Sequence, residues 1–138
     1  MLNAALMGGV AFQKGLGATH SMAHALSTVC DLHHGLANGI AIPYVMAFNK
    51  VAVPERLADL GAAVGAAPGA DAFVRWLVDF KARIGIPRTL TEAGVARDRM
   101  DRLVDVAVHD ACHPNNPRPV TEPDFRWLFE RAFSGELS

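Results

Sequence analysis

Histidines are concentrated near the start of the chain, at spacings that could bring imidazole rings together. Four of the six lie in the segment 15–38, GLGATHSMAHALSTVCDLHHGLAN. His20 and His24 are four residues apart, so on a helix they share one face. His33 and His34 follow after a short gap. Imidazole binds zinc, iron, copper and nickel, and the segment is therefore a candidate metal site.

The spacing leaves two interpretations of His20 and His24 open, a pair of metal ligands or two packed polar residues. Ser, Met and Ala lie between them, so the pair is not the HExxH motif of zinc proteases, which needs a glutamate base. His34 on the following turn would allow three imidazoles to converge. Three neutral nitrogens leave the charge of a divalent ion uncompensated, and Asp31 is the nearby carboxylate that could act as a fourth ligand.

A second pair of histidines, His109 and His113, has the same spacing. Pro114 follows directly, so we expect His113 at a helix end, where histidine interacts well with the helix dipole and with free carbonyls. The polar, proline-interrupted stretch 110–118 is predicted to be a rigid turn in which Asn side chains bind the backbone.

The elements that must position these residues are predicted to be helices. The chain is rich in alanine and only 7% aromatic, which favours packed helices over sheet, and no run alternates with a period of two. We expect a kink or a restart at Pro43, and Thr89 with Glu92 matches a capping box. The predicted helices cover residues 3–12, 19–30, 36–49, 54–64, 71–84, 97–111 and 122–133. The fold class is therefore all-α, a helical bundle forming one domain over 1–138.

Three of these helices carry expectations about burial. In 122–133 the inward side chains are Phe125, Leu128, Phe129 and Ala132. In 71–84 an apolar stripe of Phe73, Leu77, Phe80 and Ile84 lies opposite Arg75, Asp79 and Arg83. The helix 3–12 has almost no polar face, so we expect another segment or partner to cover it, and the chain alone to self-associate.

Composition excludes several classes of partner. A net charge of -1 gives no electrostatic reason to expect nucleic acid or an anionic membrane surface. Two cysteines are too few for a disulfide scaffold and indicate reduced thiols in a cytoplasmic protein. The apolar N-terminus lacks the basic region of a signal peptide and is too short to span a membrane.

The stretch GLGATHSMAHALSTVCDLHHGLANGIAIPYVMAFN resembles the second signature of the iron-containing (group III) alcohol dehydrogenases. Those proteins carry a G-x-x-H-x-x-x-H helix, a D-x-x-H-G turn and an apolar N-x-x-x-x-P segment. The D-x-C-x-x-x-N-P-R of Asp110 to Arg118 also resembles their C-terminal end. Thr28 and His33 depart from the common pattern, and neither is a presumed ligand.

The resemblance implies a fold and a site. His20 and His34 would be two of four ligands of a divalent ion, Fe²⁺ or alternatively Zn²⁺. His24 would be a catalytic neighbour able to carry a proton, which differs from the pairing that spacing alone suggests. The other two ligands would come from an Asp-x-x-x-His helix that this chain lacks. NAD or NADP would bind through an N-terminal nucleotide-binding domain that is also absent.

Two functions of different class follow. In the first, the chain is the C-terminal metal-binding domain of an alcohol dehydrogenase-type oxidoreductase, which interconverts a small alcohol and an aldehyde while the metal polarises the substrate oxygen. Such a chain would be inactive alone and completed by the missing N-terminal domain or a homo-oligomer partner. In the second, it is a stand-alone, non-catalytic helical metal-binding or interaction module.

Overall fold

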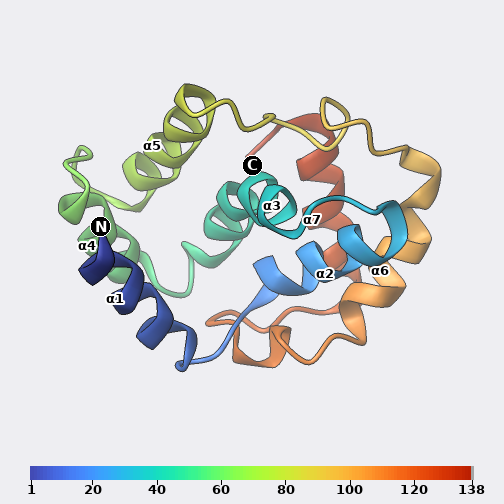
Figure 1. Cartoon of the computed structure of the whole chain (residues 1–138), viewed down its shortest axis with the longest axis horizontal. Helices are drawn as coiled ribbons and strands as arrows, with labels where there is room; N and C mark the ends of the chain where they lie inside the picture. Colours follow the sequence, from blue (N-terminus) through green and yellow to red (C-terminus); the bar gives the residue numbers. More distant parts are fainter. Residues whose placement is uncertain (138) are drawn as a thin grey trace.

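The computed structural model describes residues 1–137, and within that range the chain forms helices and no strand. This confirms the all-α prediction (Figure 1). The α-helices are α1 (Leu2–Phe12), α2 (Ala18–Cys30), α3 (His34–Asn49), α4 (Pro54–Ala63), α5 (Ala70–Arg83), α6 (Met100–Val108) and α7 (Glu122–Ser134). Two short 3-10 helices are η1 (Arg97–Arg99) and η2 (His113–Asn115).

Helix α3 lies at the centre of the molecule (Figure 1). Helices α2 and α7 pack against it, α6 packs against both α2 and α7, and α5 contacts α3 and pairs with α4. The side of α2 that faces the core carries small residues, among them Ala18, Ala23 and Ala25, which are fully buried. Such small side chains let neighbouring helix backbones approach closely, so α2 and its histidines are held firmly within the bundle.

Helix α7 agrees with the sequence prediction at both its start and its buried face. Thr121 and Asp124 form a capping box at its N-terminus, and Gly135 ends the helix in the left-handed conformation. The four predicted inward side chains are all fully buried, namely Phe125, Leu128, Phe129 and Ala132.

Two predicted helix boundaries are wrong. Helix α3 begins at His34, two residues before the predicted start, and continues through the buried Pro43 without a restart. The helix predicted over 97–111 is instead η1 followed by α6, which ends at Val108. Residues 109–111 leave the helix because Asp110 there turns toward α2, as described below.

The predicted capping box at Thr89 is half formed, and no helix follows it. The Glu92 N–H donates to Thr89 Oγ1 at 3.1 Å, but the Glu92 carboxylate accepts the N–H of Arg88 rather than that of Thr89. The segment closes as a turn with Gly94 at φ +80°, and the next helical residue is Arg97. The same side-chain bonds that cap a helix here stabilise an isolated turn.

Helix α5 buries a lysine that the apolar stripe did not predict. Phe73 is buried as expected, whereas Phe80 and Ile84 are exposed. Lys81 is only 4% exposed, and its Nζ donates to the carbonyls of Ile40 at 3.1 Å and Arg88 at 3.4 Å. Burial lowers the pKa of Lys81 to about 8.

Helix α1 contributes no buried residue. Its large apolar side chains Leu2, Leu6, Met7, Val10 and Phe12 are all exposed. The expectation that this helix lacks cover within the chain is confirmed. No helix among residues 1–137 combines the length and the apolar character needed to cross a membrane.

Candidate metal and catalytic site

Three imidazole rings meet where α2 passes the start of α3. His20 and His24 lie on α2, and His34 is the first residue of α3. The ring centroids are 5.5 Å apart for His20 and His34, 5.2 Å for His24 and His34, and 6.0 Å for His20 and His24. Two imidazoles bound tetrahedrally to one ion would have centroids about 5 Å apart. The predicted ligands His20 and His34 therefore have a spacing that suits a shared ion.

His20 and His34 also line a cleft of about 950 Å³. Its wall includes the polar side chains of Asn38 and Asn49 and apolar side chains of α3 and α4 such as Ile42, Met46 and Leu57. His24 contacts the other two rings but is not part of the cleft lining. A mixed polar and apolar cleft of this size can hold a small organic molecule.

The surroundings of the two cleft-lining histidines include polar groups that could also bind a metal. Burial, followed by the proximity of His34 and His24, lowers the pKa of His20, so its ring is neutral near pH 7. The Nδ2 of Asn38 lies 3.1 Å from Nε2 of His34 and 3.0 Å from the His34 carbonyl. The Oδ1 of Asn38 is buried and accepts no hydrogen bond from residues 1–137. Imidazole nitrogens and an unpartnered carbonyl oxygen form a donor set that fits a divalent cation.

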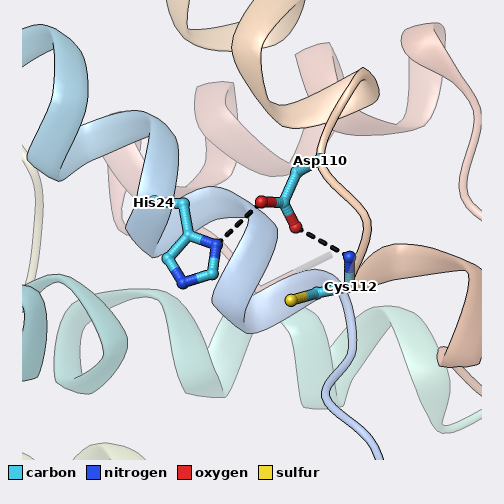
Figure 2. A group of neighbouring side chains, drawn as sticks. All are labelled: His24, Asp110 and Cys112. Carbon is cyan, nitrogen blue, oxygen red and sulfur yellow. Dashed lines mark hydrogen bonds and ion pairs between the residues drawn. The ribbon is translucent and has the colours of Figure 1, made fainter.

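The carboxylate beside the histidines belongs to Asp110 rather than to Asp31. Asp31 ends α2 in the left-handed conformation, with φ 53°. Asp110 Oδ2 lies 2.7 Å from Nδ1 of His24, and its Oδ1 accepts the backbone N–H of Cys112 at 2.8 Å (Figure 2). The same Oδ1 accepts the Ser21 hydroxyl at 2.7 Å. Burial alone would raise the pKa of Asp110, but these hydrogen bonds outweigh it and lower the pKa to about 2.

The group formed by His24, Asp110 and Cys112 has the composition of a metal site, with donor atoms within 4.8 Å of one another. Two ligand atoms around one ion are separated by about 3.4 Å, because each lies about 2.1 Å from the metal. The contact of 2.7 Å between His24 and Asp110 is shorter and has hydrogen-bond geometry. Figure 2 accordingly shows a hydrogen-bonded cluster around the Asp110 carboxylate.

Residues 110–118, which we call the strap, also fix the relative position of α2 and α3. The Asn116 Oδ1 accepts the N–H of Ala18 at the start of α2, at 3.3 Å, and Nδ2 of Asn49 at the end of α3, at 3.2 Å. The Arg118 guanidinium donates to the Phe48 carbonyl and lies 3.7 Å from the Phe48 ring centroid. The strap therefore aligns the helix that carries His20 and His24 with the helix that carries His34.

Gly17, the N-cap of α2, is required by this close approach. A Cβ at this position would lie 2.9 Å from Oδ1 of Asn116 and 3.5 Å from its Cα. Such a contact would force the strap away from α2. The glycine before the histidines, Gly17, is therefore explained by the strap, which packs directly against it.

The remaining histidines have structural roles. The Nδ1 of His109 lies 2.8 Å from the Asp105 carbonyl, and Nε2 of His113 lies 3.0 Å from the Val108 carbonyl. Both rings therefore donate to carbonyls of α6. His113 begins η2 instead of ending the preceding helix, but its ring binds the last carbonyl of α6, as predicted. His33 is the exposed N-cap of α3 and hydrogen-bonds neither to the cluster nor to a carboxylate in the described part of the chain.

The sequence prediction missed Asp110 as the partner of His24, and Ser21 and Cys112 as the groups that donate to Asp110. The D-x-C-x-x-x-N-P-R stretch contains Asp110 and Cys112, but its composition by itself predicts only a turn stabilised by Asn–backbone bonds. That interpretation is correct for Asn116, whose Nδ2 donates to the Arg118 carbonyl. It did not anticipate that the strap reaches α2.

Comparison with known proteins places these features in context. Residues 1–133 match the model described as Fe-containing alcohol dehydrogenase family, C-terminal. The chain is 35% identical to a 4-hydroxybutyrate dehydrogenase of Cupriavidus necator, over 96% of this chain and 37% of that protein. It is 32% identical to a 1,3-propanediol dehydrogenase of Citrobacter freundii, over 96% of this chain and 36% of the relative.

Solved structures agree with these matches. A 1,3-propanediol oxidoreductase superposes with a TM-score of 0.80 at 31% identity, covering 86% of this chain and 33% of that one. A maleylacetate reductase from Rhizobium sp. strain MTP-10005 gives a TM-score of 0.73 at 34% identity, covering 88% and 33%. The chain thus spans little more than a third of the length of the relatives that it matches.

Proposed function

The chain belongs to the Fe-containing alcohol dehydrogenase family, whose C-terminal part it matches, and we propose that it supplies half of the metal site of an NAD(P)-dependent alcohol dehydrogenase. The observation that carries this proposal is the convergence of His20 and His34, with centroids 5.5 Å apart, at the wall of the cleft. The substrate would be a small alcohol or aldehyde, in keeping with the names of the relatives.

Each residue of the cluster has a role in this proposal. His20 and His34 would hold Fe²⁺ or Zn²⁺, and a bound ion supplies Lewis-acid polarisation of an oxygen, while NAD(P) supplies the redox chemistry. His24 would accept or return the hydroxyl proton, because its imidazole lies against both proposed ligands while its Nδ1 is bound to the Asp110 carboxylate. Apolar residues of the cleft, such as Ile42 and Met46, would bind the carbon chain of the substrate.

The proposed site is incomplete within these 138 residues. Two imidazoles leave the charge of a divalent ion uncompensated, and the Asp110 carboxylate beside His24 is already occupied by hydrogen bonds. The sequence also contains no GxGxxG fingerprint for a dinucleotide. We therefore propose that two further ligands and the nucleotide site come from an N-terminal domain, and that the complete protein acts in the cytoplasm.

A second candidate function is supported by helix α1. Its exposed apolar side chains are typical of a surface that another polypeptide covers. In this alternative the chain is a non-catalytic interaction module, and its histidines bind metal without supporting turnover.

The test measures metal binding and turnover separately. Titration of the metal-free chain with Co²⁺, followed by visible absorption, is expected to show weak binding that is lost in His20→Ala and in His34→Ala. His109→Ala is the matched control, because His109 is exposed and bonded to its own helix. Binding that survives both substitutions would contradict the ligand assignment. NAD⁺-dependent oxidation of 1,3-propanediol by the isolated chain would contradict the proposal that its metal site and nucleotide site need a further domain.

A further inference from the structure

We propose that Asp110 is a positioning residue that fixes His24 in the tautomer with its proton on Nδ1, leaving Nε2 as the proton-accepting atom. The inference deepens the function proposed above, since it says which atom of His24 would exchange the proton. Its geometric basis is the contact of 2.7 Å between Asp110 Oδ2 and His24 Nδ1.

The tautomer follows from what the carboxylate can do. An ionised carboxylate has no hydrogen to donate, so any hydrogen bond with His24 requires that Nδ1 carries the hydrogen. The hydrogen bonds that Asp110 accepts from Ser21, His24 and Cys112 keep its pKa far below neutrality despite burial, so the group is ionised. A neutral imidazole has a single N–H, and Nε2 of His24 must then have the lone pair.

The Cys112 thiol does not compete for this role. Burial, together with the neighbouring Asp110 carboxylate, raises the pKa of Cys112, so the sulfur remains a protonated thiol. A thiol is a weak acceptor and a weak donor, and the backbone N–H of Cys112 already binds Oδ1 of Asp110. The neutral thiol therefore leaves Oδ2 as the strongest acceptor beside Nδ1.

The atom left with the lone pair lies on the side of the His24 ring away from Asp110. The Nε2 atom is on the ring edge away from Asp110 (Figure 2). The ring stacks on His34 at an interplanar angle of 20° and meets His20 edge-on, and the His24 side chain is 38% exposed. We expect a hydroxyl or a water beside the proposed ligands to donate to His24 Nε2, while the hydrogen bond from Nδ1 to Asp110 fixes the orientation of the ring.

The substitution Asp110→Asn is expected to reverse the tautomer of His24. The Cys112 N–H is a fixed donor to the Oδ1 position and the Ser21 hydroxyl points to the same atom, so the amide oxygen will occupy that position. The amide NH₂ then takes the place of Oδ2 and faces Nδ1 of His24. Because an NH₂ group is a donor, the imidazole must offer a lone pair at Nδ1, and its proton moves to Nε2.

The experiment reads the tautomer by NMR of the full 138-residue chain labelled with ¹⁵N-histidine, in chelator and at a pH where imidazole is neutral. His24→Gln identifies the His24 signals. In the unsubstituted chain we expect a pyrrole-type Nδ1 and a pyridine-type Nε2, and in Asp110→Asn the two types exchanged. Asp101→Asn is the matched control, since it is the same change on α6 at an exposed carboxylate paired with Arg126. Ser21→Ala should leave the tautomer unchanged, because the carboxylate remains.

Two outcomes would overturn the proposal. One is a pyridine-type Nδ1 in the unsubstituted chain, which stays decisive even where Asp110→Asn fails to fold. The other is a folded Asp110→Asn protein, verified by circular dichroism, with the tautomer of the unsubstituted chain. Neither measurement involves a metal, a nucleotide or turnover, so its failure is distinguishable from failure of the proposed dehydrogenase function.

Discussion

The side-chain amides of Asn49 and Asn116 bind each other in both directions. The Nδ2 of Asn49 donates to Oδ1 of Asn116 at 3.2 Å, and Nδ2 of Asn116 donates to Oδ1 of Asn49 at 2.7 Å. Both residues are buried, and Asn116 also accepts the N–H of Ala18. One amide pair thus joins the end of α3, the start of α2 and the strap.

Asn116→Ala is expected to destabilise the fold by about 2–4 kcal/mol, because it removes several buried hydrogen bonds and leaves the Asn49 amide unsatisfied. Urea unfolding followed by circular dichroism measures this change. The neighbouring Asn115 is exposed, so Asn115→Ala should change the free energy of unfolding by less than about 0.5 kcal/mol. Equal losses of unfolding free energy in the two variants would show that the Asn49–Asn116 amide pair does not stabilise the fold.

Asp110 should make the fold sensitive to acid. Its folded-state pKa is about 2, below the ordinary value of 3.8, so the unfolded chain binds the proton more readily. The stabilisation is therefore fully present above about pH 4 and is lost as the pH falls toward 2, with a size on the order of 1–2 kcal/mol. Unfolding free energies of the unsubstituted chain and Asp110→Asn should diverge above pH 4 and converge near pH 2. Parallel curves would contradict this assignment.

Lys81 should affect stability in the opposite pH range. Its folded pKa is about 8 against an ordinary 10.5, so between these values the unfolded chain binds more protons and stability rises with pH. The rise attributable to Lys81 is at most on the order of 3 kcal/mol. Lys81→Met should remove it and leave stability at pH 7 unchanged or increased, since a buried charge is replaced by an apolar chain of similar length. A large loss of stability at pH 7 would show that its bonds to Ile40 and Arg88 outweigh the cost of burial.

Helix α1 should drive self-association of the isolated chain. We expect the mass measured by light scattering to rise with protein concentration, because the apolar side chains of α1 have no cover within the chain. Leu6→Glu should shift the chain toward monomer, whereas Gln13→Glu, which adds the same charge just beyond the helix, should not. A monomer at every concentration would contradict the prediction.

Local signals in the sequence predicted helices better than they predicted contacts. Helix α7 was correctly predicted because its N-cap Thr121 and its apolar spacing are both local features of the sequence. The His24–Asp110 contact joins residues 86 positions apart, and no spacing rule connects them. The burial of Lys81 was not predicted, because helical periodicity does not register an ammonium that reaches carbonyls on other segments.

In the candidate site, too, the sequence predicted the local motifs but not the contact between distant segments. Recognisable motifs pointed to His20, His24 and His34, and the structure brings their rings together. Their roles as ligands and proton carrier stay predictions. Spacing could not predict which carboxylate lies beside the histidines. Asp31 is close to them in sequence, whereas Asp110 is the one in contact with His24.

The strap is synthesised after α2 and α3, although it contacts α2, which carries His20 and His24. A ribosome will have added all three histidines more than 70 residues before it adds Asp110. A nascent chain that has passed α6 but not the strap has the rings of the site without the Asn116 and Asp110 contacts that align them. The arrangement of these three histidines is therefore fixed only as the strap emerges, and a message truncated before it would encode the histidines but not their arrangement.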